Sequence, residues 1–209
     1  MADLPEPSEA SLLAAWNPAT TGEWELSAME KAILPVSKFD AARRQLETAI
    51  RLYFSQGDPV SIHTLASAAA QILQDLSKHR GGDPMLFREA FVQHFRPEQQ
   101  PEVKKTLAAA ENFFKHAHRD PETVLRFRIG QTELVLLEAV EAYHRLTSER
   151  VPLLVVYWVW FMIEAGKELV VPAEVEALRR KSRQSFTTTS RQAFFSDVLP
   201  IAASLGTEP

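Results

Sequence analysis

The fold of this chain follows from residues 37–82, which read SKFDAARRQLETAIRLYFSQGDPVSIHTLASAAAQILQDLSKHRGG. In the first part of this stretch, apolar residues recur every three or four positions, the spacing that places them along one face of an α-helix. Ser37 is a suitable N-cap, and Asp40 is its acidic partner three positions later. Gly57 is expected to end the helix. These signals predict a helix between Ser37 and Gly57.

The second part of the stretch predicts another helix. Asp58 is a suitable cap, and Pro59 fits the first helical position. The buried face would carry small and aliphatic side chains: Ile62, Leu65, Ala66, Ala69, Leu73 and Leu76. Because only a very short link separates the two helices, they are predicted to form an antiparallel hairpin.

The remaining sequence predicts further helices and no strands. Apolar spacing and proline or glycine breaks place the helices at about residues 85–95, 101–118, 131–146, from 152 onward, 173–184 and 190–205. The prediction is an all-α fold, an antiparallel helical bundle of four to five main helices with extra peripheral helices. We expect three parts, namely an N-terminal arm (1–36), a bundle core (37–166) and C-terminal helices packed on the core (167–209).

Composition excludes several classes of function. The chain has 209 residues, a net charge of −4 and no cysteine, which rules out disulfides, thiolate metal sites and a cysteine nucleophile. The negative charge disfavours a nucleic-acid footprint over the whole surface but leaves room for a local basic patch. No glycine-rich nucleotide loop or metal-binding histidine motif occurs, so neither a cofactor nor a metal is expected.

The sequence also predicts a cytoplasmic protein with no membrane contact. The longest apolar run, residues 151–163, is shorter than the roughly 20 residues that a membrane span needs. The first residues lack the basic and apolar segments of a signal peptide.

The densest polar cluster lies near the end of the helix expected at 101–118. Asn112 and His116 are four positions apart and share a face, where they are candidate catalytic residues toward a phosphate or a ribose hydroxyl. Lys115 and Arg119 would neutralise phosphate charge. The alternative is a solvent-exposed helix end, at which cations favour the negative pole of the helix dipole. The inward side of this helix would carry Val103, Leu107, Ala110, Phe114 and Ala117.

The helix order and the Asn112-x-x-x-His116 spacing resemble the HEPN superfamily of small helical bundles, over roughly residues 37–163. The resemblance implies binding of RNA or a nucleotide within a bacterial stress or defence system, and pairing of two bundles. One position departs from the family motif, because Glu111 stands where ribonuclease members carry arginine. A carboxylate there would repel phosphate, so the motif is compatible with a catalytic or a non-catalytic protein.

A second local signal is the basic run Arg179, Arg180, Lys181 and Arg183. A phosphate-rich partner would explain such a run in an acidic protein. The alternative is a solvated helix face whose cations pair with nearby glutamates. The two functional hypotheses are therefore an RNA- or nucleotide-binding protein and a non-catalytic protein–protein interaction or regulatory module.

Residues 153–163 are apolar nearly all round, whereas a peripheral helix needs one apolar stripe. Trp158 and Trp160 would point in different directions, and tryptophan is a frequent interface anchor. We expect a homodimer on this basis. The competing explanation is that residues 167–209 or the N-terminal arm cover the second face.

Overall fold

The computed structural model describes residues 33–81, 97–98, 100–117, 121–165, 176–177, 180 and 190–205. The chain divides into two units, 1–36 and 37–209, and all helices described below belong to the second. The helix expected at 85–95, most of the one at 173–184 and most of the N-terminal arm lie outside the described residues.

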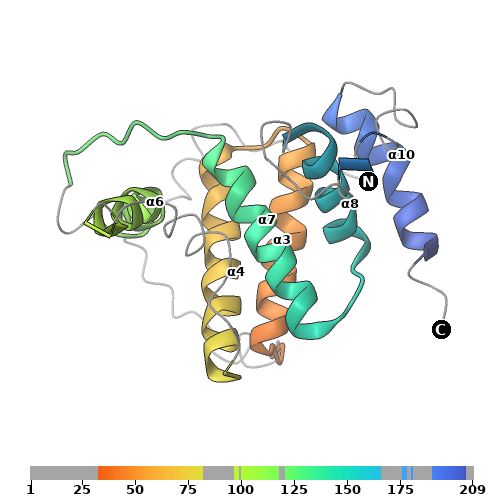
Figure 1. The fold of residues 1–209 in the computed structure, drawn as a ribbon, viewed down its shortest axis with the longest axis horizontal. Coiled ribbons are helices and arrows are strands. Elements are labelled where there is room, and N and C mark those ends of the chain that lie inside the picture. The colour runs from red at the N-terminus through yellow and green to blue at the C-terminus, as the bar shows by residue number, and fades with distance from the viewer. Residues whose placement is uncertain are drawn as a thin grey trace, which may run out of the picture. The chain divides into compact units, whose positions relative to one another are not determined.

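Every regular element in the described part of the chain is helical, which confirms the all-α prediction (Figure 1). The elements in order are α3 (Lys38–Phe54), α4 (Pro59–His79), α6 (Gln100–Lys115), α7 (Gln131–Thr147), α8 (Pro152–Trp160), the π-helical turn η1 (Phe161–Ala165) and α10 (Arg191–Leu205). Among these residues no helix is both long and apolar enough to cross a membrane.

The predicted hairpin is present in α3 and α4. The Ser37 hydroxyl accepts a hydrogen bond from the Asp40 amide at 3.0 Å, and the Asp40 carboxylate accepts one from the Ser37 amide at 3.1 Å. This reciprocal capping box satisfies amides that the helix itself leaves unpaired. The Asp58 carboxylate caps α4 through the Ser61 amide at 2.7 Å, with Pro59 at the first position of the helix.

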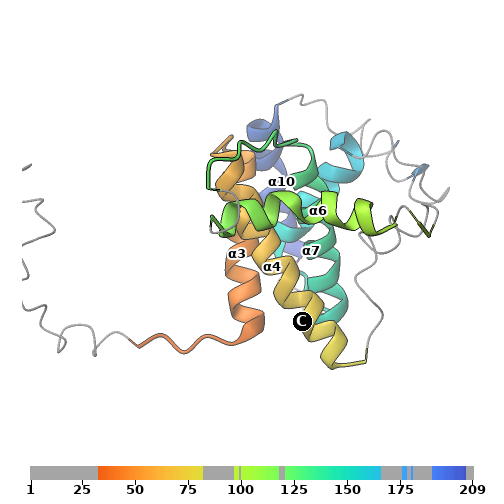
Figure 2. The ribbon, with the colours of Figure 1, turned by 90° about the vertical axis from the view of Figure 1, so that its left-hand side faces the viewer.

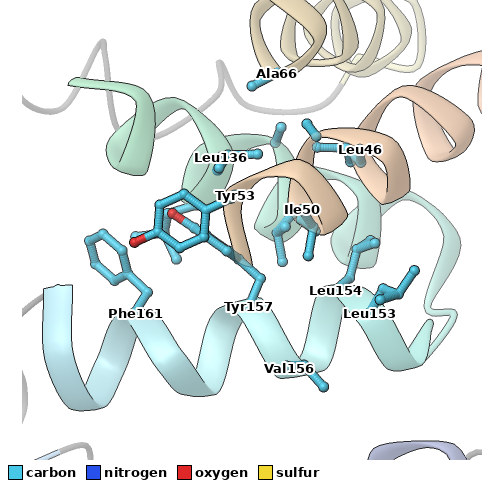
Figure 3. Close-up of a cluster of buried hydrophobic side chains, with 14 of the residues drawn as sticks. Leu46, Ile50, Tyr53, Ala66, Leu136, Leu153, Leu154, Val156, Tyr157 and Phe161 are labelled. Atoms are coloured by element: carbon cyan, nitrogen blue, oxygen red, sulfur yellow. The ribbon is translucent and has the colours of Figure 1, made fainter. Parts of the chain in front are cut away.

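The hydrophobic core forms where α7 packs on the hairpin and α8 packs on α3 (Figure 1). Figure 3 shows Leu46, Ile50 and Tyr53 of α3 between α8 and the other two helices. Facing them are Leu136, Leu153, Leu154, Tyr157 and Phe161, all at most 4% exposed.

The apolar segment 153–163 is covered within the chain. Seven of its residues are buried, and Val155, Trp158, Val159 and Met162 are half-buried. The helix α10 packs on α8, with Phe194 against Trp160 at a ring-centroid distance of 5.1 Å. The C-terminal helix α10 therefore covers part of the second apolar face of this segment, as the alternative to a dimer proposed.

Helix α6 departs from the antiparallel arrangement. It runs across α4 instead of alongside it (Figures 1 and 2). Phe114 packs edge-on against His63 of α4, with ring centroids 5.8 Å apart, and against Phe127 at 5.1 Å. Phe114 was expected on the inward side of this helix, against the first hairpin or the helix at 131–146, and its contact with His63 places it on the hairpin. Ala117 was expected to face inward but is exposed, because α6 ends two residues earlier, at Lys115.

Candidate functional site

The predicted catalytic pair lies at the end of α6. Asn112 and His116 are both exposed, and the His116 amide donates to the Asn112 carbonyl at 3.0 Å, so the two residues lie one helical turn apart. The neighbouring Lys115 Nζ is 2.7 Å from Glu111 Oε1. This ion pair offsets the positive charge that was expected to attract phosphate.

The basic run is only partly described. Arg180 is exposed, which fits both a phosphate contact and a solvated helix face. Arg119, Arg179, Lys181 and Arg183 lie outside the described residues.

A pocket of about 510 Å³ occurs elsewhere, at one end of the bundle. It opens where α3 ends and where α4, α7 and α10 begin. Its lining comprises Tyr53, Gln56, Gly57, Pro59, Ile62, Ile129, Thr132, Glu133, Ser190 and Arg191. Binding pockets for small molecules typically measure about 300–1,000 Å³ and combine apolar walls with a few convergent polar groups. Both features are present here.

One carboxylate organises the polar side of the pocket. The Tyr53 hydroxyl donates to Glu133 Oε1 at 2.7 Å, and Arg191 Nη2 lies 3.3 Å from the same oxygen. Behind them, Trp160 Nε1 donates to the Tyr53 hydroxyl at 3.1 Å. The Tyr157 hydroxyl donates to the Glu133 backbone carbonyl at 2.7 Å. Three buried aromatic residues, Tyr53, Tyr157 and Trp160, thus fix the position of Glu133 through hydrogen bonds.

Arg191 is held in two ways. Besides its contact with Glu133, its guanidinium lies over the Tyr53 ring at 4.2 Å from the ring centroid. A cation over an aromatic face is attracted by the ring quadrupole. The side chains of Glu133 and Arg191 remain 24% and 39% exposed, so the charged pair is accessible from the pocket.

Burial and the adjacent Glu133 carboxylate raise the pKa of Tyr53 well above its ordinary value. Burial likewise raises the pKa of Tyr157. Both hydroxyls therefore stay protonated at physiological pH and act as fixed hydrogen-bond donors.

The backbone at the pocket rim is strained. Gln56 has a φ of 58°, a left-handed conformation that side chains other than glycine rarely adopt. It ends α3 in a Schellman turn, in which the Gly57 amide donates to the Leu52 carbonyl at 2.8 Å and the Gln56 amide to the Tyr53 carbonyl at 3.3 Å. The same left-handed conformation occurs at Ser148, which ends α7 outside the pocket lining, so it marks the end of a helix. The turn places Gln56 in the wall of the pocket.

Gly57 ends α3 for a reason other than the one expected. The left-handed residue is Gln56, while Gly57 is required by a close approach. A Cβ atom at position 57 would lie 3.0 Å from Leu52 Cδ2 and 3.2 Å from the Leu52 carbonyl oxygen.

Sequence reasoning did not find this pocket. Tyr53 has the spacing of an ordinary core residue, Trp160 was considered only as part of the apolar segment 153–163, and Arg191 belongs to none of the motifs described above. The one local signal is position, because Pro59, Glu133 and Arg191 lie in the first turns of their helices. Their convergence follows from packing between helices.

Comparisons with models of protein families, with curated proteins and with solved structures give no match for this chain. The resemblance to the HEPN superfamily, carried by Asn112 and His116, therefore stays a prediction. The case for a functional site rests on the geometry of the pocket.

Proposed function

We propose that this chain is a regulatory binding module that recognises a small molecule in the pocket formed by Glu133, Arg191 and Gln56. The observation that carries the proposal is an accessible charged pair held in a cavity of about 510 Å³ by buried aromatic residues. Such preorganisation reduces the cost of ordering the site when a ligand binds.

Binding is favoured over catalysis because two of the three hydroxyls in the described lining, those of Tyr53 and Thr132, are engaged, and the third, that of Ser190, accepts from the Ala193 amide at 3.5 Å at the start of α10. Tyr53 donates to Glu133, and Thr132 Oγ1 lies 3.1 Å from His63 Nδ1. Thr132 and His63 are only 3% and 1% exposed, so a substrate has little access to them. The hydrogen bond between Thr132 and His63 therefore stabilises the wall of the pocket.

A ligand screen with a pocket variant tests this function. Saturation-transfer NMR would compare a library of small polar compounds on the wild type, Arg191→Ala and Arg150→Ala. Arg150 is an exposed arginine outside the pocket lining and serves as the matched control. We expect binders that are lost in Arg191→Ala and retained in Arg150→Ala. Binders that Arg191→Ala leaves unchanged, or no binder at all, would overturn the proposal.

A second candidate is RNA or nucleotide binding at the end of α6. Asn112 and His116 are exposed within one turn, and Arg126 and Arg128 are exposed on the segment that follows. These groups would supply a histidine and nearby cations to a phosphate. The Glu111–Lys115 ion pair works against this function.

The homodimer and the cytoplasmic location stay predictions from the sequence. Part of the motivation for a dimer was the need to cover residues 153–163. That need is reduced, because none of these residues is exposed in the single chain. Pairing would then use another surface.

A further inference from the structure

The charges around the pocket indicate which class of molecule it accepts. Among the described residues of its lining, Glu133 and Arg191 are the charged ones, and they contribute one negative and one positive charge. Both belong to one ion pair with a separation of 3.3 Å. A simple anion bound to Arg191 would therefore lie close to a carboxylate, and a simple cation bound to Glu133 would lie close to a guanidinium.

The pair also retains unused hydrogen-bonding capacity. Tyr53 and Arg191 both contact Oε1 of Glu133, and within the described residues no contact involves Oε2. A guanidinium carries five N–H donors, and the contact with Glu133 occupies only Nη2. The site thus offers an acceptor beside a group of donors.

The rest of the lining adds a further polar group and an apolar wall. The strained turn places Gln56, whose amide both donates and accepts, in the pocket. Pro59, Ile62 and Ile129 supply apolar surface. A matching ligand has a polar head and an apolar body.

We propose that the ligand is a molecule of zero net charge that presents a hydrogen-bond donor beside an acceptor on an apolar body. Glu133 receives the donor and Arg191 donates to the acceptor. This inference rests on the proposed binding function. A zwitterionic amino acid and the amide edge of a nucleobase share this chemistry, and the experiment separates them.

The test compares probes that differ in charge; leucine and leucinamide are nearly equal in size, whereas N-acetylleucine adds an acetyl group and uridine monophosphate adds a phosphate. Isothermal titration of the full chain would use leucine as the zwitterion, N-acetylleucine as the anion, leucinamide as the cation, and uridine with uridine monophosphate as the nucleobase pair. We expect leucine to bind at least tenfold more tightly than both of its charged analogues, or uridine at least tenfold more tightly than its monophosphate. Leucine binding alone identifies the zwitterion, and uridine binding alone identifies the base edge.

Two charge variants make the test independent of any single substitution. Glu133→Gln leaves the pocket net positive and should shift preference toward N-acetylleucine, whereas Arg191→Gln should shift it toward leucinamide. Circular dichroism melting checks that both variants fold. A wild type that prefers a charged analogue in an Arg191-dependent way overturns the ligand class while leaving the binding function intact. Failure of every probe also overturns the ligand class, and the broad screen described above then judges the binding function separately.

Discussion

Replacement of Tyr53 by phenylalanine tests whether the buried network holds the pocket together. The substitution removes one hydroxyl and keeps the ring, so it leaves almost no cavity. That hydroxyl donates to Glu133 at 2.7 Å and accepts from Trp160 at 3.1 Å. Tyr53 is 4% exposed and Trp160 is 6% exposed, so water has little access to either lost bond.

The magnitude follows from these two bonds. A hydrogen bond to a charged group contributes about 1.5–3 kcal/mol, and a buried donor left without an acceptor costs about 1–3 kcal/mol. The side chain of Glu133 is 24% exposed and keeps its contact with Arg191, which places the first contribution near the lower end. We expect Tyr53→Phe to lower the free energy of unfolding by about 2.5–4.5 kcal/mol in total.

The assay is urea unfolding followed by circular dichroism, with Tyr143→Phe as the matched control. The Tyr143 hydroxyl donates to Glu149 at the same distance, 2.7 Å, but the Glu149 side chain is 53% exposed. Tyr143 is itself only 2% exposed, but its substitution leaves no buried donor unpaired, and water can solvate the exposed Glu149 carboxylate, so the control should lose less stability than Tyr53→Phe. If Tyr53→Phe costs no more than Tyr143→Phe, the network does not stabilise the pocket as described.

Three further predictions follow from the same structure. The folded-state pKa of Tyr53 is raised, so its stabilising contribution is present below about pH 10 and is lost as the pH rises further. Urea unfolding at pH 9 and pH 11 should therefore show a larger decrease in the free energy of unfolding for the wild type than for Tyr53→Phe. Gln56→Gly should relieve strain and raise the free energy of unfolding by up to about 1 kcal/mol. Gly57→Ala should lower the free energy of unfolding by about 1–3 kcal/mol, because the added Cβ atom clashes with Leu52. Equal effects of the two substitutions in thermal melts would contradict the assigned turn. If the end of α6 binds RNA, fluorescence anisotropy should detect salt-sensitive binding that His116→Ala weakens several-fold, and unchanged binding in that variant would exclude the site.

The helices were predictable because their signals are local. The capping box of Ser37 and Asp40, and the Asp58-Pro59 start of α4, act within a few residues and set the helix boundaries whatever lies around them. The short link between the two helices then favours their packing as an antiparallel hairpin. The Glu111–Lys115 pair is also local, since residues four apart meet on a helix surface, so the sequence itself could have indicated that Lys115 is engaged.

The candidate site was decided by tertiary structure alone. Tyr53 and Glu133 are 80 positions apart, and Glu133 and Arg191 are 58 apart, so no local pattern relates them. They meet because the hydrophobic faces of α3, α7, α8 and α10 must bury one another, and this packing brings the end of α3 and the first turns of α7 and α10 together. The sequence by itself thus determined where the helices lie along the chain. The packing of their apolar faces decided which of their polar ends share a pocket.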